Sequence, residues 1–93
     1  GEEHPDTLTS RNNLALVLGD LGRLGEAEAE LRAVLEARRR VLGEEHPDTL
    51  TSRNNLALVL GDLGRLEEAE AEHRAVLEAR RRLLGEEHPT RNN

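Results

Sequence analysis

Residues 43–84 read GEEHPDTLTSRNNLALVLGDLGRLEEAEAEHRAVLEARRRLL, and residues 1–42 carry the same stretch without a gap. The two copies are identical at 39 of 42 positions. The three differences are Gly25 against Glu67, Leu31 against His73, and Val41 against Leu83. A period of this length is typical of solenoid proteins, in which each unit buries its apolar face against its neighbours. The stretch therefore predicts a repeat array.

Outside the two copies only residues 85–93 remain, and they begin a third copy. Gly85 to Pro89 repeat the opening of each unit, after which the register is lost. We therefore expect a single domain over residues 1–93, with full repeats at 1–42 and 43–84 and a partial repeat at 85–93. The chain has no initiating Met and no signal-peptide pattern, which is typical of a processed chain or of a piece of a longer one.

Each unit is predicted to open with a helix. Pro5 suits the first helical position, because its ring fixes φ and it lacks an N–H. Asp6 follows it, where a carboxylate favours the positive end of the helix dipole. Gly22 is a candidate for the left-handed residue that ends this helix, because glycine adopts positive φ without steric cost.

A second helix is expected from about Leu24 to Leu42, with Gly43 ending it. Its apolar residues recur at i, i+3, i+4 and i+7, which is the spacing of one helix face. Glutamates near its start and the arginine run at residues 38–40 near its end match the helix dipole. We expect these arginines to be solvated, with phosphate binding as the alternative. Alternating β-branched or aromatic runs, which would indicate strands, are absent.

Composition excludes several classes of function. Hydrophobic residues make up 35% of the chain, charged residues make up 34%, and the net charge is −6. The lack of Cys excludes disulfides and thiolate chemistry, and the lack of Phe, Trp and Tyr excludes stacking on aromatic rings. The acidic charge argues against nucleic acid and anionic membranes, and no apolar run is long enough to cross a bilayer. We expect a cytoplasmic chain with no nucleic-acid or membrane partner.

The positions of the histidines do not indicate metal binding or acid–base catalysis. His4, His46 and His88 recur once per unit, each after two glutamates. Equivalent positions in neighbouring repeats lie about 20 Å apart, because packed helices are about 8–10 Å apart, whereas ligands lie about 2 Å from a metal ion. These histidines are therefore placed in inter-repeat turns, and His73 is interpreted as a tolerated substitution. No catalytic, cofactor-binding or metal-ligating residue is predicted, and an enzyme is not expected.

The order of small and large residues in each unit follows a known pattern, carried in the first unit by Asn13, Leu14, Ala15, Leu18, Gly22, Arg23, Leu24, Glu26, Ala27, Leu31, Val34 and Leu35. This pattern resembles the tetratricopeptide repeat. Leu stands at the family's aromatic positions, and the proline that closes the 34-residue unit is absent. The unit is similar to the 42-residue variety found in kinesin light chains and in bacterial arrays. The resemblance implies an all-α fold, a right-handed α-solenoid of antiparallel helix pairs.

In tetratricopeptide arrays the first helix of each unit lines a concave groove that binds peptides. The resemblance places ten residues there: Thr9, Asn12, Asn13, Leu16, Asp20, Thr51, Asn54, Asn55, Leu58 and Asp62. An asparagine amide both donates and accepts, so it can hold a peptide backbone, and Asn13 and Asn55 match the family's ligand-clamping position. Thr9 and Thr51 stand where a Lys would capture a C-terminal carboxylate, so we do not expect that mode. The alternative is that the asparagines bond to neighbouring helices or water, and that Leu16 and Leu58 pack between helices.

Two functions remain open. The first is a protein-interaction scaffold that binds an unidentified peptide or partner helix in the groove. The alternative is a designed or excised repeat array that serves as a folding model and has no native ligand, which the near-identity of the repeats favours. The start of one chain is complementary to the end of another, so we also expect homo-oligomers formed by end-to-end stacking or helix swapping.

Overall fold

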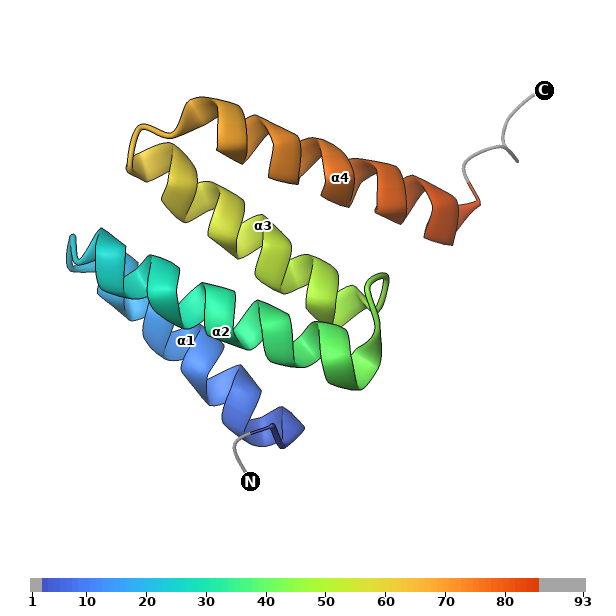
Figure 1. Cartoon of the computed structure of the whole chain (residues 1–93), viewed down its shortest axis with the longest axis horizontal. Coiled ribbons are helices and arrows are strands. Elements are labelled where there is room, and N and C mark those ends of the chain that lie inside the picture. The colour runs from blue at the N-terminus through green and yellow to red at the C-terminus, as the bar shows by residue number, and fades with distance from the viewer. Residues whose placement is uncertain (1–2, 86–93) are drawn as a thin grey trace.

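The computed structural model describes residues 3–85, which form four helices: α1 (Pro5–Asp20), α2 (Leu24–Leu42), α3 (Pro47–Asp62) and α4 (Leu66–Leu84). No strand occurs in this part of the chain. Each repeat is an antiparallel helix pair, and the pairs stack so that α3 lies between α2 and α4 (Figure 1). The predicted all-α repeat fold is confirmed. The predicted partial repeat falls, apart from Gly85, outside the described residues.

Helices α1 and α3 begin with a histidine cap. Nδ1 of His4 accepts a hydrogen bond from the backbone N–H of Asp6 at 3.0 Å, and His46 does the same for Asp48. A side-chain acceptor at this position satisfies one of the amide groups that a helix start leaves free. Pro5 follows as the first helical residue, as predicted. The sequence placed the histidines correctly in the turns but did not reveal that they cap the helices.

The helix ends confirm the division of each unit into two helices. Gly22 and Gly64 have φ of 82° and 85°, and Gly43 has φ of 99°. These backbone angles lie in the region that residues with a side chain rarely adopt. The glycines therefore end α1, α2 and α3 where the sequence predicts.

One apolar cluster joins the two repeats. It is made of leucine, valine and alanine from all four helices: Ala15, Leu18, Ala27, Leu31, Leu35, Leu56, Val59, Leu60 and Ala69. The alanines have short side chains, so the helices can approach closely where they cross. Because the cluster runs through the α2–α3 contact, the apolar core belongs to the stack of repeats as well as to each helix pair.

Arg38 lies inside this stack, which corrects the expectation that the arginine run is solvated. Its side chain is buried. Nη1 donates to the carbonyl oxygen of Asp48 at 3.1 Å and to Oγ of Ser52 at 2.9 Å, and Nη2 donates to Oγ1 of Thr9 at 3.3 Å. Buried charged groups are stable only when they are hydrogen-bonded, and these three acceptors meet that need. Arg38 thus ties α2 to both α1 and α3.

Candidate binding groove

The first helix of each repeat carries a row of polar and apolar side chains that is turned away from the core. Most of the predicted groove residues lie on this row and are exposed: Thr9, Asn13, Leu16, Asp20, Thr51, Leu58 and Asp62. Asp62 is the equivalent of Asp20 on the other repeat. Asn54 and Asn55 are half-buried and Asn12 is buried. We call the seven exposed residues together with Asn55 the groove row.

The asparagines divide into two kinds. Nδ2 of Asn55 donates to Oδ1 of Asn12 at 3.3 Å, which joins α3 to α1. This is the contact between neighbouring helices that the sequence left open as an alternative. Asn13 forms no side-chain hydrogen bond within the described residues, so its amide is free to meet a ligand.

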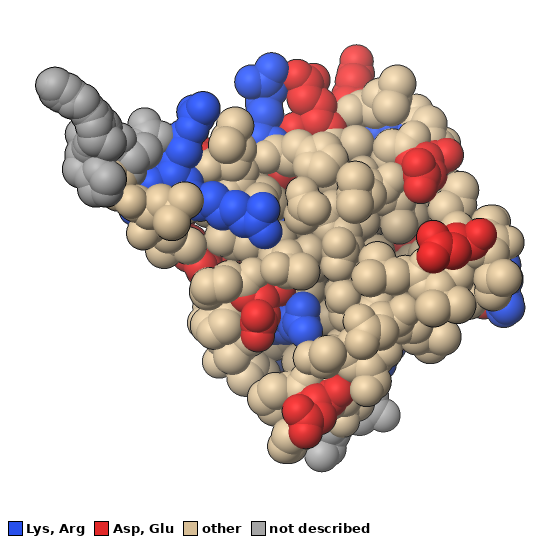
Figure 2. All heavy atoms as spheres, turned by 180° about the vertical axis from the view of Figure 1, so that it is seen from behind, with Lys and Arg blue, Asp and Glu red and all other residues tan. Residues whose placement is uncertain are grey.

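Charge on the groove row is acidic and unpaired. Asp20 and Asp62 are exposed and form no ion pair with any side chain in residues 3–85, whereas Glu30 on α2 is bound by Arg11 at 2.9 Å. Seen from behind, with α1 nearer to the viewer than α2, uncharged side chains form most of the middle of the surface and charged ones are scattered around them (Figure 2). The two carboxylates are therefore the charges that a ligand along this row would meet.

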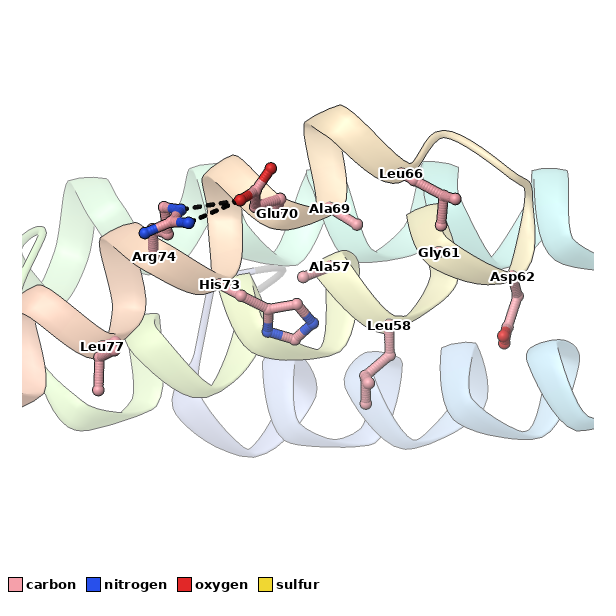
Figure 3. A pocket seen from close by; sticks show the side chains of 10 residues that line it. All are labelled: Ala57, Leu58, Gly61, Asp62, Leu66, Ala69, Glu70, His73, Arg74 and Leu77. Carbon is pink, nitrogen blue, oxygen red and sulfur yellow. Dashed lines mark hydrogen bonds and ion pairs between the residues drawn. The ribbon is translucent and has the colours of Figure 1, made fainter.

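An open hollow of about 650 Å³ lies between α3 and α4. Its lining is mainly small or apolar, with Glu70, His73 and Arg74 along α4 (Figure 3): Ala57, Leu58, Gly61, Asp62, Leu66, Ala69, Glu70, His73, Arg74 and Leu77. The His73 ring points across the hollow toward α3, while Glu70 pairs with Arg74 at 2.8 Å. The sequence singled out Leu58 and Asp62 but not the hollow. The one feature of the sequence that could have indicated the hollow was His73, which replaces the Leu31 of the first copy.

Arg65 links the two repeats through ion pairs. Nη1 lies 3.0 Å from a carboxylate oxygen of Glu28, and Nε donates to Glu68 at 2.6 Å.

The hydrogen bond from Arg65 lowers the pKa of Glu68, with burial acting in the opposite direction. The hydrogen bonds to Glu68 and Glu26 raise the pKa of Arg65 and Arg23 respectively. Since the folded pKa of Glu68 is depressed, its contribution to stability is present above the ordinary pKa of glutamate and is lost as pH falls through the lowered value.

Within residues 3–85, no three His, Asp or Glu side chains are grouped so that they could hold a metal ion. His4 and His46 serve as helix caps, and His88 lies outside the described residues. None of the four helices in the described part is both long and apolar enough to cross a membrane.

Stacked antiparallel helix pairs with a core that runs from one pair into the next define an all-α helical repeat protein. The sequence model of the tetratricopeptide repeat matches residues 6–82, so the chain belongs to the tetratricopeptide repeat family. The predicted resemblance is confirmed. Such repeats generally mediate protein–protein interaction and are generally not enzymes.

The chain is also similar to a solved structure. This is the crystal structure of a singly substituted form of the nearly identical TPR-like repeats of a putative kinesin light chain from Podospora anserina, with a TM-score of 0.82 and 28% sequence identity. The match covers 92% of this chain and 41% of that one, so this chain spans less than half the length of its structural relative. The comparison with curated proteins found no match.

Proposed function

We propose that the chain is a protein-interaction scaffold whose groove row binds an extended, basic segment of a partner protein. The observation that carries the proposal is the repetition of one set of exposed side chains on α1 and α3. Thr, Leu and Asp of each first helix stand exposed at equivalent positions, and an asparagine accompanies them. An extended peptide that lies across both helices would meet the same groups twice.

The charge of the row indicates the chemistry of the ligand. Asp20 and Asp62 have no partners among the described residues, and none of the ten predicted groove positions is basic. A Lys or Arg side chain of a ligand would supply the missing positive charge, whereas a free C-terminal carboxylate would be repelled. Leu16 and Leu58 would contact the aliphatic parts of such a segment, and the Asn13 amide would bond to its backbone. A cytoplasmic location belongs to the same proposal and stays a prediction.

A pair of designed peptides tests this function. We expect a fluorescent, end-blocked peptide of alternating alanine and lysine to bind, as measured by anisotropy, and the matching peptide of alternating alanine and glutamate not to bind. Binding should weaken as salt is raised, because the groups are solvent-exposed. The double variant D20N/D62N should weaken the affinity severalfold.

The control must remove the same amount of charge elsewhere. Glu67 and Glu78 are exposed on α4 and lie outside the groove row, so E67Q/E78Q changes the net charge equally. If this control weakens binding as much as D20N/D62N, or if both peptides bind alike, attraction to the whole acidic chain explains the result and the groove assignment is wrong.

A further inference from the structure

The two ends of the stack expose apolar side chains whose equivalents inside it are buried. On α1, Leu14 and Val17 are 49% and 54% exposed, whereas Leu56 and Val59 on α3 are buried. On α4, Leu77 is 50% exposed, whereas its equivalent on α2, Leu35, is buried. The exposed face of α4 is therefore equivalent to the face of α2 that contacts α3. The exposed face of α1 is equivalent to the face of α3 that contacts α2.

The hollow beside α4 is lined by residues equivalent to those that contact α3 inside the stack. We call the surface that α3 covers there its seat. Ala57 and Ala69 form part of the floor of the hollow. Their equivalents, Ala15 and Ala27, are buried in the cluster that holds Leu56 and other α3 residues. Inside the stack this seat is filled by α3, whose sequence PDTLTSRNNLALVLGD is identical to that of α1.

We propose that α1 of a second copy of this chain docks on α4 and fills the hollow, so that two chains stack head to tail. The contact repeats the α2–α3 packing, with Leu14 and Val17 of the second copy lying where Leu56 and Val59 lie inside the chain. This inference does not rest on the proposed function. Leu58 and Asp62 belong both to the groove row and to the lining of the hollow, but their equivalents Leu16 and Asp20 stay exposed in the first repeat, where α3 already packs against α2.

Charged groups at the two ends match as well. Inside the chain, Arg65 reaches across the repeat boundary to Glu28, which Arg32 also binds at 2.9 Å. At the outer end Glu70 already pairs with Arg74 in the same way. Arg23 of the second copy is the equivalent of Arg65, so it would complete the same three-membered set on Glu70.

Arg80, like Glu70, is a charged group on α4 that would gain a partner in the stacked pair. Its equivalent, Arg38, is buried and donates to Ser52 and to the carbonyl oxygen of Asp48. Arg80 is exposed. In the stacked pair it would donate to Ser10 and to the carbonyl oxygen of Asp6 of the second copy.

His73 sets the strength of this contact. It stands at the position of Leu31, which is fully buried in the apolar cluster that joins the two repeats. An imidazole buried there would lose water, and it contributes less apolar area than leucine. The chain-to-chain contact is therefore weaker than the contact between repeats inside one chain, and we expect it to depend on protein concentration.

Two complementary variants test the proposal on the full chain by sedimentation velocity over a range of concentrations. V17E spoils the α1 face and L77E spoils the α4 face, and each should weaken self-association by about tenfold or more. A head-to-tail contact uses one face of each kind. A mixture of V17E and L77E should therefore form a one-to-one pair that does not grow. H73L should strengthen association by about tenfold and extend the stacks.

Two controls follow from the interior of the chain. Leu16 and Leu83 are exposed like the tested residues, but their equivalents, Leu58 and Val41, stay exposed beside an internal repeat boundary. L16E and L83E should therefore leave association unchanged, and circular dichroism should show all four Glu variants equally helical. The proposal is overturned by an unmodified chain that stays monomeric at millimolar concentration in high salt. It is also overturned by V17E or L77E associating alone, which indicates a symmetric contact, or by a mixture whose chains have exchanged helices.

Discussion

Helices α1 and α3 have the same sixteen-residue sequence, yet they occupy different environments. Leu56 on α3 is 1% exposed, and Leu14, the same residue in α1, is 49% exposed. Thr49 and Ser52 are buried in α3, while Thr7 and Ser10 are exposed in α1. Both helices form with the same caps and the same ends, so local sequence determines the helix. Its neighbours determine how much of the helix is buried, and therefore how much each side chain stabilises the fold.

The largest difference is expected for the leucine at this position. Leu56→Ala should lower the free energy of unfolding by about 2–5 kcal/mol, because it opens a cavity in the cluster that joins the repeats. Leu14→Ala should lower it by less than about 1 kcal/mol, since much of that side chain is already in water. Urea unfolding followed by circular dichroism, at a concentration low enough to prevent association, measures both. Equal losses would contradict the assignment of the core to the repeat boundary.

The arginine pair should show the next largest difference. Arg38→Ala leaves Ser52 and the carbonyl of Asp48 without their shared donor, and we expect a loss of about 1–3 kcal/mol. Arg80→Ala removes an exposed side chain and should change stability by less than about 0.5 kcal/mol. The same unfolding measurement compares them. A loss at Arg80 as large as at Arg38 would mean that the end of the stack is already covered in the single chain.

The asparagine pair divides the groove into structural and free amides. Asn55→Ala removes the hydrogen bond to Asn12 and should cost about 1 kcal/mol. Asn13→Ala should leave the thermal midpoint unchanged, because its amide has no partner among the described residues. If the two variants melt at the same temperature, the bond between α1 and α3 contributes nothing measurable.

The smallest effect is expected where the two copies differ at the start of the second helix. Gly25→Glu should raise stability by about 0.5 kcal/mol, because glycine disfavours helix and a carboxylate suits the first turn. No atom outside its own neighbourhood lies within 4 Å of the Cβ that a side chain would place there. Glu67→Gly should lower stability by about the same amount, as seen in the thermal midpoint. A destabilised Gly25→Glu variant would show that this turn has a role in packing that burial does not reveal.

The sequence predicts the parts of the fold that short-range physics determines. Pro5 and Gly22 each restrict or permit a backbone angle at one position, so the helix limits follow from the residues themselves. The apolar face of the second helix could also be recognised from its spacing. Which residues of that face contact the partner helix of the same repeat, and which contact the next repeat, could not be predicted, because this depends on whether another helix lies beside it.

The candidate site was only partly predictable for the same reason. The groove row follows from the family resemblance, and most of its residues are exposed. The burial of Asn12 and Arg38 depends on the crossing of α1, α2 and α3, which no local pattern encodes. The hollow beside α4 exists because, among the described residues, no helix packs on α4 in the way that α3 packs on α2. Among the α4 residues that line the hollow, only His73 differs from its equivalent on α2.

Hydrogen exchange tests most directly the claim that neighbours, not local sequence, set the stability of these helices. Peptides from α1 and α3 have equal masses, so the exposed Asp62 is changed to Glu to mark α3. In dilute solution we expect the backbone amides of the α1 peptide to exchange faster than those of the α3 peptide, because α1 is packed on fewer sides. Equal exchange rates for the two peptides would contradict it.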